Sequence, residues 1–86
     1  MTAPSNVEHV LDTTGLFCPE PVMLLHNKIR AIASGDCVRV LATDPSTQRD
    51  IPKFCNFLGH TLLEQNVLEG RGGATAEQFI YLIQKA

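Results

Sequence analysis

Basic residues are scarce in this sequence, which has seven Lys and Arg against nine Asp and Glu and a formal net charge of −2. A protein that binds nucleic acid directly normally carries a basic patch or stripe, so we do not expect nucleic acid as a partner. Long apolar runs are also missing, since no segment approaches the roughly 20 residues of a membrane-spanning helix. The first residues lack the basic start and the apolar stretch of a secretory signal. We therefore expect neither membrane association nor secretion.

Cysteine is sparse, with Cys18, Cys37 and Cys55 as the three occurrences. An odd number of cysteines without a secretory signal fits a reducing cytoplasm better than a disulfide framework. No two of them form a Cys-x-x-Cys pair, and the three histidines show no metal-ligand spacing. We therefore expect a cytoplasmic protein without a zinc site.

The length and composition predict one domain over residues 1–86, with residues 1–6 expected to be disordered. Apolar residues make up 44% of the chain and charged residues 19%, a composition typical of a globular domain with a single core. Runs rich in β-branched residues predict strands, and apolar residues at helical spacing predict helices. The predicted strands are 7–12, 37–43, 60–68 and 78–84, and the predicted helices are 22–33 and about 49–58.

This β-α-β-α-β-β order favours an α/β two-layer sandwich, in which two helices cover one face of a mixed four-stranded sheet. Residues 69–75 contain three glycines, and they are expected to form a hairpin loop between the last two strands. The first helix should bury Val22, Leu25, Ile29 and Ile32, and it should end at Ser34-Gly35-Asp36 through a C-terminal glycine.

The second helix has conflicting start signals. Asp44-Pro45-Ser46-Thr47 combines capping residues with an early proline, which is typical of a helix start. Pro52 would break a helix that began so early, so the regular part is expected to begin nearer Arg49. Gly59 is expected to end it. Its predicted core stripe is Ile51, Phe54, Cys55 and Leu58.

The most informative segment is Gly15-Leu16-Phe17-Cys18-Pro19-Glu20-Pro21, between the first predicted strand and the first predicted helix. A thiol there lies at or near a helix N-terminus, where unpaired N–H groups and the helix dipole favour an anion. Pro19 and Pro21 restrict the backbone and indicate a stiff turn, with the helix regular from Pro21 or Val22. Because the thiolate is the reactive form of cysteine, we predict that Cys18 is an exposed, reactive thiol.

The other two cysteines lack this setting. Cys37 opens an alternating strand pattern, and Cys55 falls within the apolar stripe of the second helix. Free cysteines are most often small apolar residues of a core. We therefore expect both to be buried.

Two sequence blocks resemble a known family. They are Gly15-Leu16-x-Cys18-Pro19-Glu20-Pro21-Val22-Met23 and Asp44-Pro45-x-Thr47-x-Arg49-Asp50-Ile51-Pro52-x-Phe54-Cys55-x-Phe57. Together with Tyr81-Leu82-Ile83, they resemble the signature of the TusA/SirA-like family of small sulfur-carrier proteins, over nearly the whole chain from about Val10. Within that family, the resemblance is closest to the TusA carriers of tRNA 2-thiouridine synthesis.

The resemblance implies that Cys18 accepts sulfur as a persulfide from a cysteine desulfurase and hands it to a downstream protein of a sulfur relay. Pro19, Glu20 and Pro21 would support it as motif residues. Because the sulfur would be held as a covalent persulfide on Cys18, no organic cofactor is expected. The protein would be a monomeric sulfurtransferase-type carrier rather than a stand-alone turnover enzyme. The expected partner-docking residues are Met23, Lys28, Arg30, Asp44 and Arg49.

Several of these residues have a second interpretation from the sequence alone. Glu20 is also typical of a first-turn acid that complements the helix dipole, and Met23 of a packing residue. Asp44 is typical of a helix cap. Arg49 and Asp50 together are typical of a solvated ion pair, whereas the resemblance implies that they help to hold the Cys18 surface.

Two other classes of protein remain open. A thiol redox enzyme would use Cys18 as its reactive thiol and would need Cys37 or Cys55 to approach it. A non-catalytic interaction or regulatory module would use the Cys-Pro turn only to shape a surface. An internal disulfide after mild oxidation would favour the first class, and retained function of a Cys18→Ser variant would favour the second.

Overall fold

The computed structural model describes residues 8–68 and 77–86 and confirms the predicted β-α-β-α-β-β order. The expected disorder of residues 1–6 and the expected hairpin loop at 69–75 both lie outside the described residues. The elements are β1 (Glu8–Thr13), α1 (Glu20–Ala31), β2 (Cys37–Ala42), α2 (Thr47–Leu58), β3 (Thr61–Leu68) and β4 (Gln78–Gln84).

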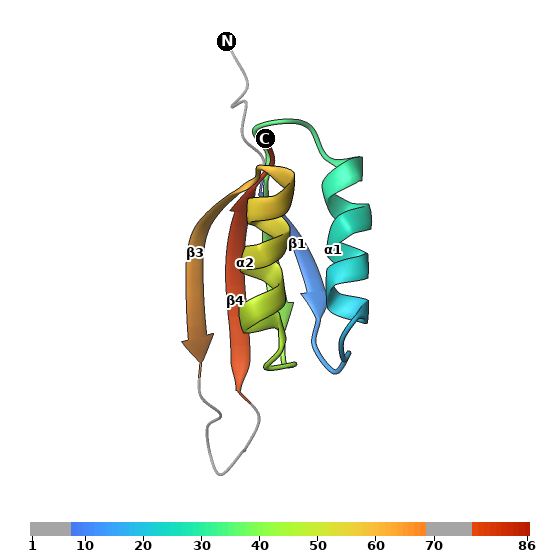
Figure 1. Ribbon diagram of the computed structural model, residues 1–86, viewed down its shortest axis with the longest axis vertical. Coiled ribbons are helices and arrows are strands. Elements are labelled where there is room, and N and C mark those ends of the chain that lie inside the picture. Colours follow the sequence, from blue (N-terminus) through green and yellow to red (C-terminus); the bar gives the residue numbers. More distant parts are fainter. Residues whose placement is uncertain (1–7, 69–76) are drawn as a thin grey trace.

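The four strands form one mixed sheet in the order β1-β2-β4-β3. β1 and β2 are parallel, with Leu11 opposite Val40, because α1 returns the chain to the starting edge of the sheet. β4 is antiparallel to both of its neighbours and places Tyr81 opposite Val40. Both helices lie on one face of the sheet (Figure 1), which confirms the predicted two-layer sandwich.

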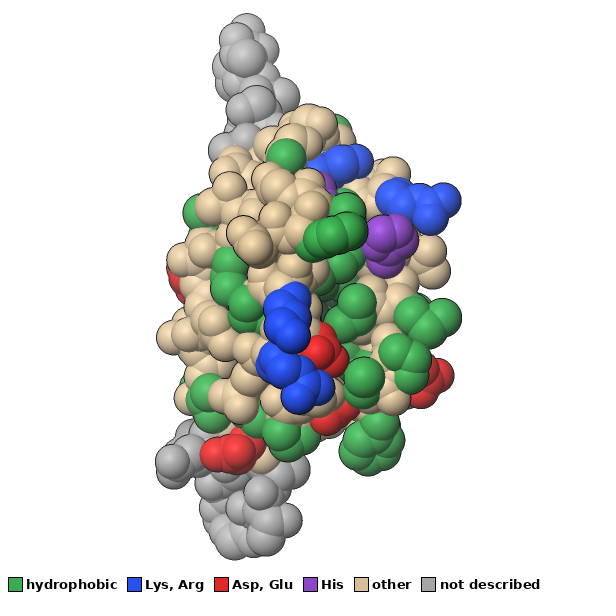
Figure 2. All heavy atoms as spheres, viewed as in Figure 1, with side chains coloured by type: hydrophobic (Ala, Val, Ile, Leu, Met, Phe, Trp, Pro, Cys, Tyr) green, Lys and Arg blue, Asp and Glu red, His purple; other side chains and the backbone are tan. Residues whose placement is uncertain are grey.

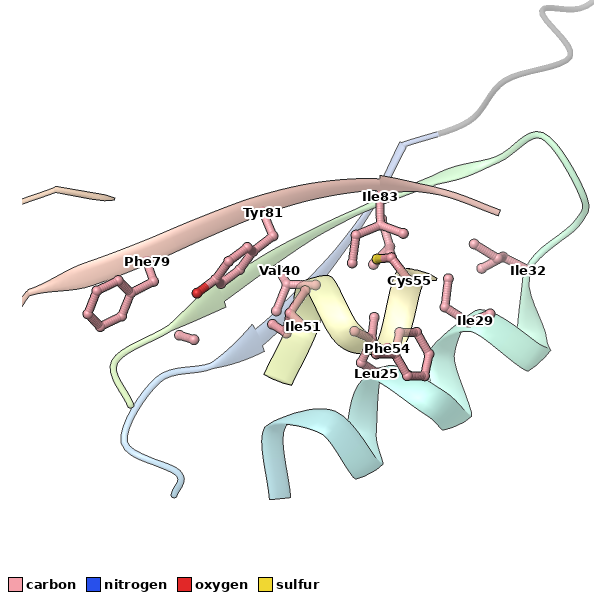
Figure 3. Close-up of a cluster of buried hydrophobic side chains, with 12 residues drawn as sticks. Leu25, Ile29, Ile32, Val40, Ile51, Phe54, Cys55, Phe79, Tyr81 and Ile83 are labelled. Carbon is pink, nitrogen blue, oxygen red and sulfur yellow. The ribbon is translucent and has the colours of Figure 1, made fainter. Parts of the chain in front are cut away.

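The core lies between the sheet and the two helices. Alternate side chains of β2 and β4 point toward the apolar stripes of α1 and α2 (Figure 3). Burial of a large apolar side chain contributes about 1.5–3 kcal/mol, so this layer supplies most of the stability. The buried apolar residues are Leu25, Ile29, Ile32, Val38, Val40, Ala42, Ile51, Phe54, Cys55, Phe79, Tyr81 and Ile83, with Leu11, Val22 and Leu62 partly buried beside them.

Helix α1 begins and ends two residues earlier than predicted. At its start, Pro21 fits the first turn, where its missing N–H removes no helical hydrogen bond, and Glu20 is helical despite the proline that follows it. At its end, Ile32 already has extended backbone, with φ of −103° and ψ of 166°. Gly35, with φ of +90°, belongs to the next turn. The predicted glycine cap of this helix was therefore wrong.

Helix α2 begins at Thr47, so the break expected at Pro52 does not occur. A proline at this position removes one backbone hydrogen bond, the one to the carbonyl of Gln48. The neighbouring Ile51 and Phe54 are buried against the sheet. Tertiary packing of an apolar face contributes more to helix stability than a single hydrogen bond, and it keeps the helix continuous.

The C-terminal end of α2 confirms one prediction and corrects another. Gly59 caps the helix with φ of +80°, a left-handed conformation that favours glycine. Leu58, however, is 39% exposed and does not belong to the core. As the last helical residue it is followed by the capping turn rather than by another helical turn, so the buried stripe ends at Cys55.

Candidate functional site

The turn after β1 carries Cys18 at the carboxyl-terminal edge of the two parallel strands. Gly15 has φ of +82°, which glycine adopts without strain. Its N–H donates to Oγ1 of Thr43 at 2.8 Å, and the N–H of Leu16 donates to the carbonyl of Thr13 at 3.1 Å. Because Thr13 ends β1 and Thr43 follows β2, these bonds tie the cysteine turn to the ends of both strands.

Asp44 holds the backbone of Cys18 directly. Its Oδ2 accepts the N–H of Cys18 at 2.6 Å and the hydroxyl of Ser46 at 2.8 Å, and its Oδ1 accepts the N–H of Ser46 at 3.0 Å. Hydrogen bonds from Ser46, then from Cys18, and the charge of Arg49 lower the pKa of Asp44, although burial opposes them. Asp44 is 8% exposed, so it can influence a docking partner only through the turn that it holds.

A buried hydrogen-bond chain connects Asp44 to the core. Oγ1 of Thr47 donates to the backbone carbonyl of Asp44 at 2.7 Å. The hydroxyl of Tyr81 lies 2.9 Å from the same Oγ1 and donates to it, because the proton of Thr47 is already used. Both side chains are fully buried, and burial raises the pKa of Tyr81, which keeps its hydroxyl neutral. Strand β4 thereby supports the cysteine turn through the start of α2.

The thiol of Cys18 is exposed and faces a carboxylate. Its Sγ lies 3.5 Å from Oδ2 of Asp50, and the thiol donates because a carboxylate can only accept. The other oxygen of Asp50, Oδ1, accepts from Nε of Arg49 at 3.2 Å. The ion-pair interpretation of Arg49 and Asp50 is therefore incomplete, because the same carboxylate also contacts the thiol.

The N-terminus of α1 offers the thiol fewer backbone N–H donors than the sequence predicts. Pro19 and Pro21 have no N–H, and the N–H of Glu20 donates to the carbonyl of Phe17 at 2.9 Å. The side chain of Glu20 is exposed, and the Cys18–Pro19 peptide bond is cis. The hydrogen-bond partner of Sγ is thus a carboxylate, and not one of the backbone N–H groups on which the prediction depended.

An open groove of about 560 Å³ lies between residues of α1 and α2, and Cys18 is one of its lining residues. Figure 2 shows this face of the molecule, with hydrophobic side chains gathered beside acidic and basic ones. Phe57 is 88% exposed at the groove, and a large exposed apolar surface is typical of an interaction site. Cys18, Pro19 and Val22 line one side, and Asp50, Lys53 and Phe57 line the other.

The sequence analysis did not single out Lys53 or Phe57 as functional residues, and for Asp50 it offered an ion pair with Arg49 or a role in holding the Cys18 surface. Their spacing contains a usable signal, because residues three, four and seven apart share one face of a helix. This face lies next to the buried stripe of α2 and carries an acid, a base and an aromatic residue. The spacing could not predict the contact between Asp50 and Cys18, because these residues are 32 positions apart along the chain.

The structure divides the predicted docking residues into separate groups. Met23 is 59% exposed and lines a smaller groove of about 250 Å³ beside the first one. Arg49 lies near the thiol through its bond to Asp50. Lys28 and Arg30 occupy the last turn of α1, roughly 15 Å along the helix from Cys18. They do not form a continuous basic surface with Arg49 beside the thiol.

The remaining cysteines lie in different surroundings. Cys55 is 2% exposed, as predicted, and burial raises its pKa to about 11. Cys37 is partly exposed, so the prediction of a buried residue was wrong. It is the first residue of β2, where alternation places it on the face opposite Val38. Cys37 pairs with Glu8 at the starting edge of the parallel strands, whereas Cys18 follows their far edge.

Among residues 8–68 and 77–86, no three His, Cys, Asp or Glu side chains are grouped so that they could hold a metal ion. In the same residues, neither helix has the length and apolar character needed to cross a membrane.

The fold and the site define a small thiol-presenting protein, in which a two-layer α/β domain displays one cysteine on a tethered turn beside an open groove. The model of the family described as sulfurtransferase TusA matches residues 9–85. The chain belongs to the TusA family, as the two sequence blocks indicate.

Known relatives agree with this assignment. The sulfur carrier protein TusA of Pseudomonas paraeruginosa (strain DSM 24068 / PA7) is 55% identical over 85 residues, which covers 99% of this chain and 96% of that protein. The sulfur carrier protein TusA of Pseudomonas putida (strain GB-1) is 58% identical over 76 residues, covering 88% and 86%. A crystal structure of a SirA-like protein from Desulfitobacterium hafniense has the same fold, with a TM-score of 0.64, 19% identity and coverage of 90% and 97%.

Proposed function

We propose that Cys18 accepts sulfur as a persulfide from a cysteine desulfurase and passes it to a downstream relay protein in the cytoplasm, for the synthesis of 2-thiouridine in tRNA. Membership of the TusA family and the relatives named sulfur carrier protein TusA support the carrier role. The observation that carries the proposal is the exposed thiol of Cys18, a residue that lines the groove and whose backbone N–H is held by Asp44.

The chemistry requires only a thiol and a suitable partner. The Cys18 sulfur attacks the outer sulfur of the donor persulfide, a bond forms between them, and the sulfur–sulfur bond of the donor breaks. The proton released by Cys18 ends on the donor thiolate. Delivery repeats the exchange with the acceptor thiol. No net oxidation occurs, so the domain needs no redox cofactor for this exchange.

The groove between α1 and α2 is the proposed docking surface for both partners. Phe57 offers an exposed aromatic side chain, a residue type that often dominates binding energy at protein interfaces. Lys53 adds a positive charge within the groove itself. The tethered turn holds Cys18 in the lining of the groove, so a partner bound there meets the thiol without further rearrangement of the backbone.

The position of the cysteines argues against an internal redox pair. A disulfide requires Cα atoms within about 7 Å. Cys37 is the first residue of β2, whereas Cys18 follows the opposite end of β1, and strands of six residues span roughly 17 Å. Cys55 is enclosed in the core. The redox interpretation is therefore weaker than the carrier interpretation.

The proposal is tested by the mass of the protein after incubation with a cysteine desulfurase and cysteine. We expect the added mass of one sulfur atom on the wild-type chain and on Cys55→Ser, but not on Cys18→Ser. The Cys18→Ser change affects an exposed side chain, so the free energy of unfolding should stay within about 0.5 kcal/mol of wild type. Cys55→Ser should lower it by roughly 1–3 kcal/mol, because it buries a hydroxyl in the core.

Two results would contradict the proposal. An adduct that follows Cys37 or Cys55 would remove Cys18 as the carrier residue. Normal sulfur-dependent function of Cys18→Ser in cells would instead support a non-catalytic interaction module. The proposed destination is tested separately, by measuring 2-thiouridine in the tRNA of cells that depend on this protein.

A further inference from the structure

The carboxylate of Asp50 contacts the reactive sulfur of the resting protein. Its Oδ2 accepts the thiol hydrogen of Cys18, with Sγ at 3.5 Å, and its Oδ1 accepts from Arg49 at 3.2 Å. The side chain is 23% exposed, less than the 66% of Arg49. The guanidinium therefore holds one oxygen of the carboxylate, while the other oxygen faces the thiol.

We propose that Asp50 is a positioning residue that favours the sulfur-free form of Cys18 and thereby promotes delivery of the sulfur. This inference rests on the proposed carrier function. Its basis is that the bond between Asp50 and Cys18 can form in one state of the carrier only. A contact made in one of two states shifts the balance toward that state.

The unloaded state makes the contact. There Cys18 carries a thiol hydrogen, and a thiol can donate to a carboxylate. In the loaded state the same sulfur is bonded to Cβ and to the outer sulfur, so it has no hydrogen left to donate. Sγ and Oδ2 are then two acceptors that face each other.

The outer sulfur adds a second effect. A persulfide is more acidic than the corresponding thiol, so the outer sulfur carries negative charge near neutral pH. That charge lies one sulfur–sulfur bond away from a sulfur that contacts Asp50, and like charges this close repel each other. Lys53 lines the groove and Arg49 bonds the other oxygen of the carboxylate. These two cations reduce the repulsion without restoring the lost hydrogen bond.

Both effects act on an exchange that is balanced in atoms and electrons. Cys18 thiol and a donor persulfide give Cys18 persulfide and a donor thiol. One sulfur–sulfur bond forms as another breaks, and the proton of Cys18 moves to the donor sulfur. Asp50 shifts this equilibrium toward unloaded Cys18, because it stabilises the Cys18 thiol and opposes the Cys18 persulfide.

The experiment uses glutathione persulfide as the donor and glutathione as the acceptor, which avoids dependence on any partner protein. The loaded fraction of the full chain is measured by mass spectrometry at fixed ratios of the two reagents. Asp50→Asn should raise the equilibrium constant for loading about three- to tenfold, the net contribution expected of one hydrogen bond. It should also slow the release of sulfur to glutathione. Asp50→Ala should shift both quantities in the same directions, but less, because it offers no amide donor to the persulfide.

Glu64→Gln is the matched control, since it removes the same charge from an exposed position on β3. It should load and release sulfur as the wild type does. Thermal unfolding monitored by circular dichroism establishes that each variant is folded. A merely structural role for Asp50 would reduce both loading and release, whereas the proposal requires opposite changes.

An unchanged or lowered loading constant in folded Asp50→Asn would overturn the inference while leaving the carrier function intact. Failure of wild-type Cys18 to acquire sulfur would overturn the proposed function itself. The two failures are therefore distinguishable within one series of measurements.

Discussion

Among the single residues, Asp44 does most to place the thiol. One buried carboxylate accepts from the turn that carries Cys18 and from Ser46 at the start of α2. The side chain thus joins two segments that are distant in sequence. Its removal should loosen both at once, because each loses a charged acceptor.

We expect Asp44→Asn to lower the free energy of unfolding by about 1–3 kcal/mol at neutral pH, the range for a lost hydrogen bond to a charged group. Because the fold lowers the pKa of Asp44 below its ordinary value of 3.8, the stabilisation is present above that value and is lost as the pH falls through the lower folded value. Urea unfolding at several pH values should therefore show wild type and variant converging in acid. A constant difference at all pH values would contradict this account.

The sequence was sufficient to single out Cys18, because glycine and proline act on the backbone close to where they stand. It was insufficient for Asp50, since the contact with Cys18 forms only when α2 packs beside the turn. The predicted help from the helix N-terminus failed for a local reason: the two prolines that stiffen the turn also remove its N–H donors.

The two helices use their prolines differently. Pro21 lies in the first turn of α1 and its ring is fully buried, so it packs in addition to restricting the backbone. Pro52 lies inside α2, where it removes a hydrogen bond and is only partly buried. Replacement by alanine should therefore have opposite effects at the two positions.

We expect Pro21→Ala to fold but to lose about 2 kcal/mol of unfolding free energy, from lost buried carbon and a more flexible unfolded chain. Urea denaturation measures the change. Pro45→Ala, at an exposed proline, is the control and should lose less. A loss no larger than that of the control would show that the ring of Pro21 contributes little to packing.

We expect Pro52→Ala to raise the free energy of unfolding by roughly 1–3 kcal/mol. Alanine restores the N–H that can donate to the carbonyl of Gln48, and it has the highest helix propensity. Urea denaturation shows whether the free energy of unfolding rises or falls. A destabilised variant would mean that contacts of the proline ring outweigh the missing hydrogen bond.

In the molecule as a whole, the proposed carrier residue Cys18 and the proposed docking groove lie on the side of the sheet that the helices cover. The order of elements and the sheet were predictable because strand and helix periodicities alternate clearly along the chain. The groove was not, since it combines two helices whose relative placement depends on packing. Lys28 and Arg30 are close to Cys18 in the sequence, but they lie in the last turn of α1 and therefore away from the thiol.

That geometry predicts unequal effects of charge reversal on loading by a desulfurase. Lys53→Glu should slow loading several-fold, because Lys53 lines the groove next to the thiol. Arg30→Glu should have a smaller effect at 0.1 M salt, where exposed charges are screened within about 10 Å. Initial loading rates at two salt concentrations provide the measurement. Equal effects would indicate that a partner contacts the whole length of α1.

The separation of the three cysteines also determines which disulfide can form when the protein is oxidised. Cys37 lies at the starting edge of the parallel strands, opposite the edge that Cys18 follows, and Cys55 lies in the core. An oxidant acting on Cys18 therefore leaves it with only an external thiol for a disulfide. Air-exposed preparations should therefore accumulate a covalent dimer on non-reducing gels, increasing with protein concentration and missing from Cys18→Ser. Such dimers would be inactive but recoverable, because a reductant returns each copy to its thiol form.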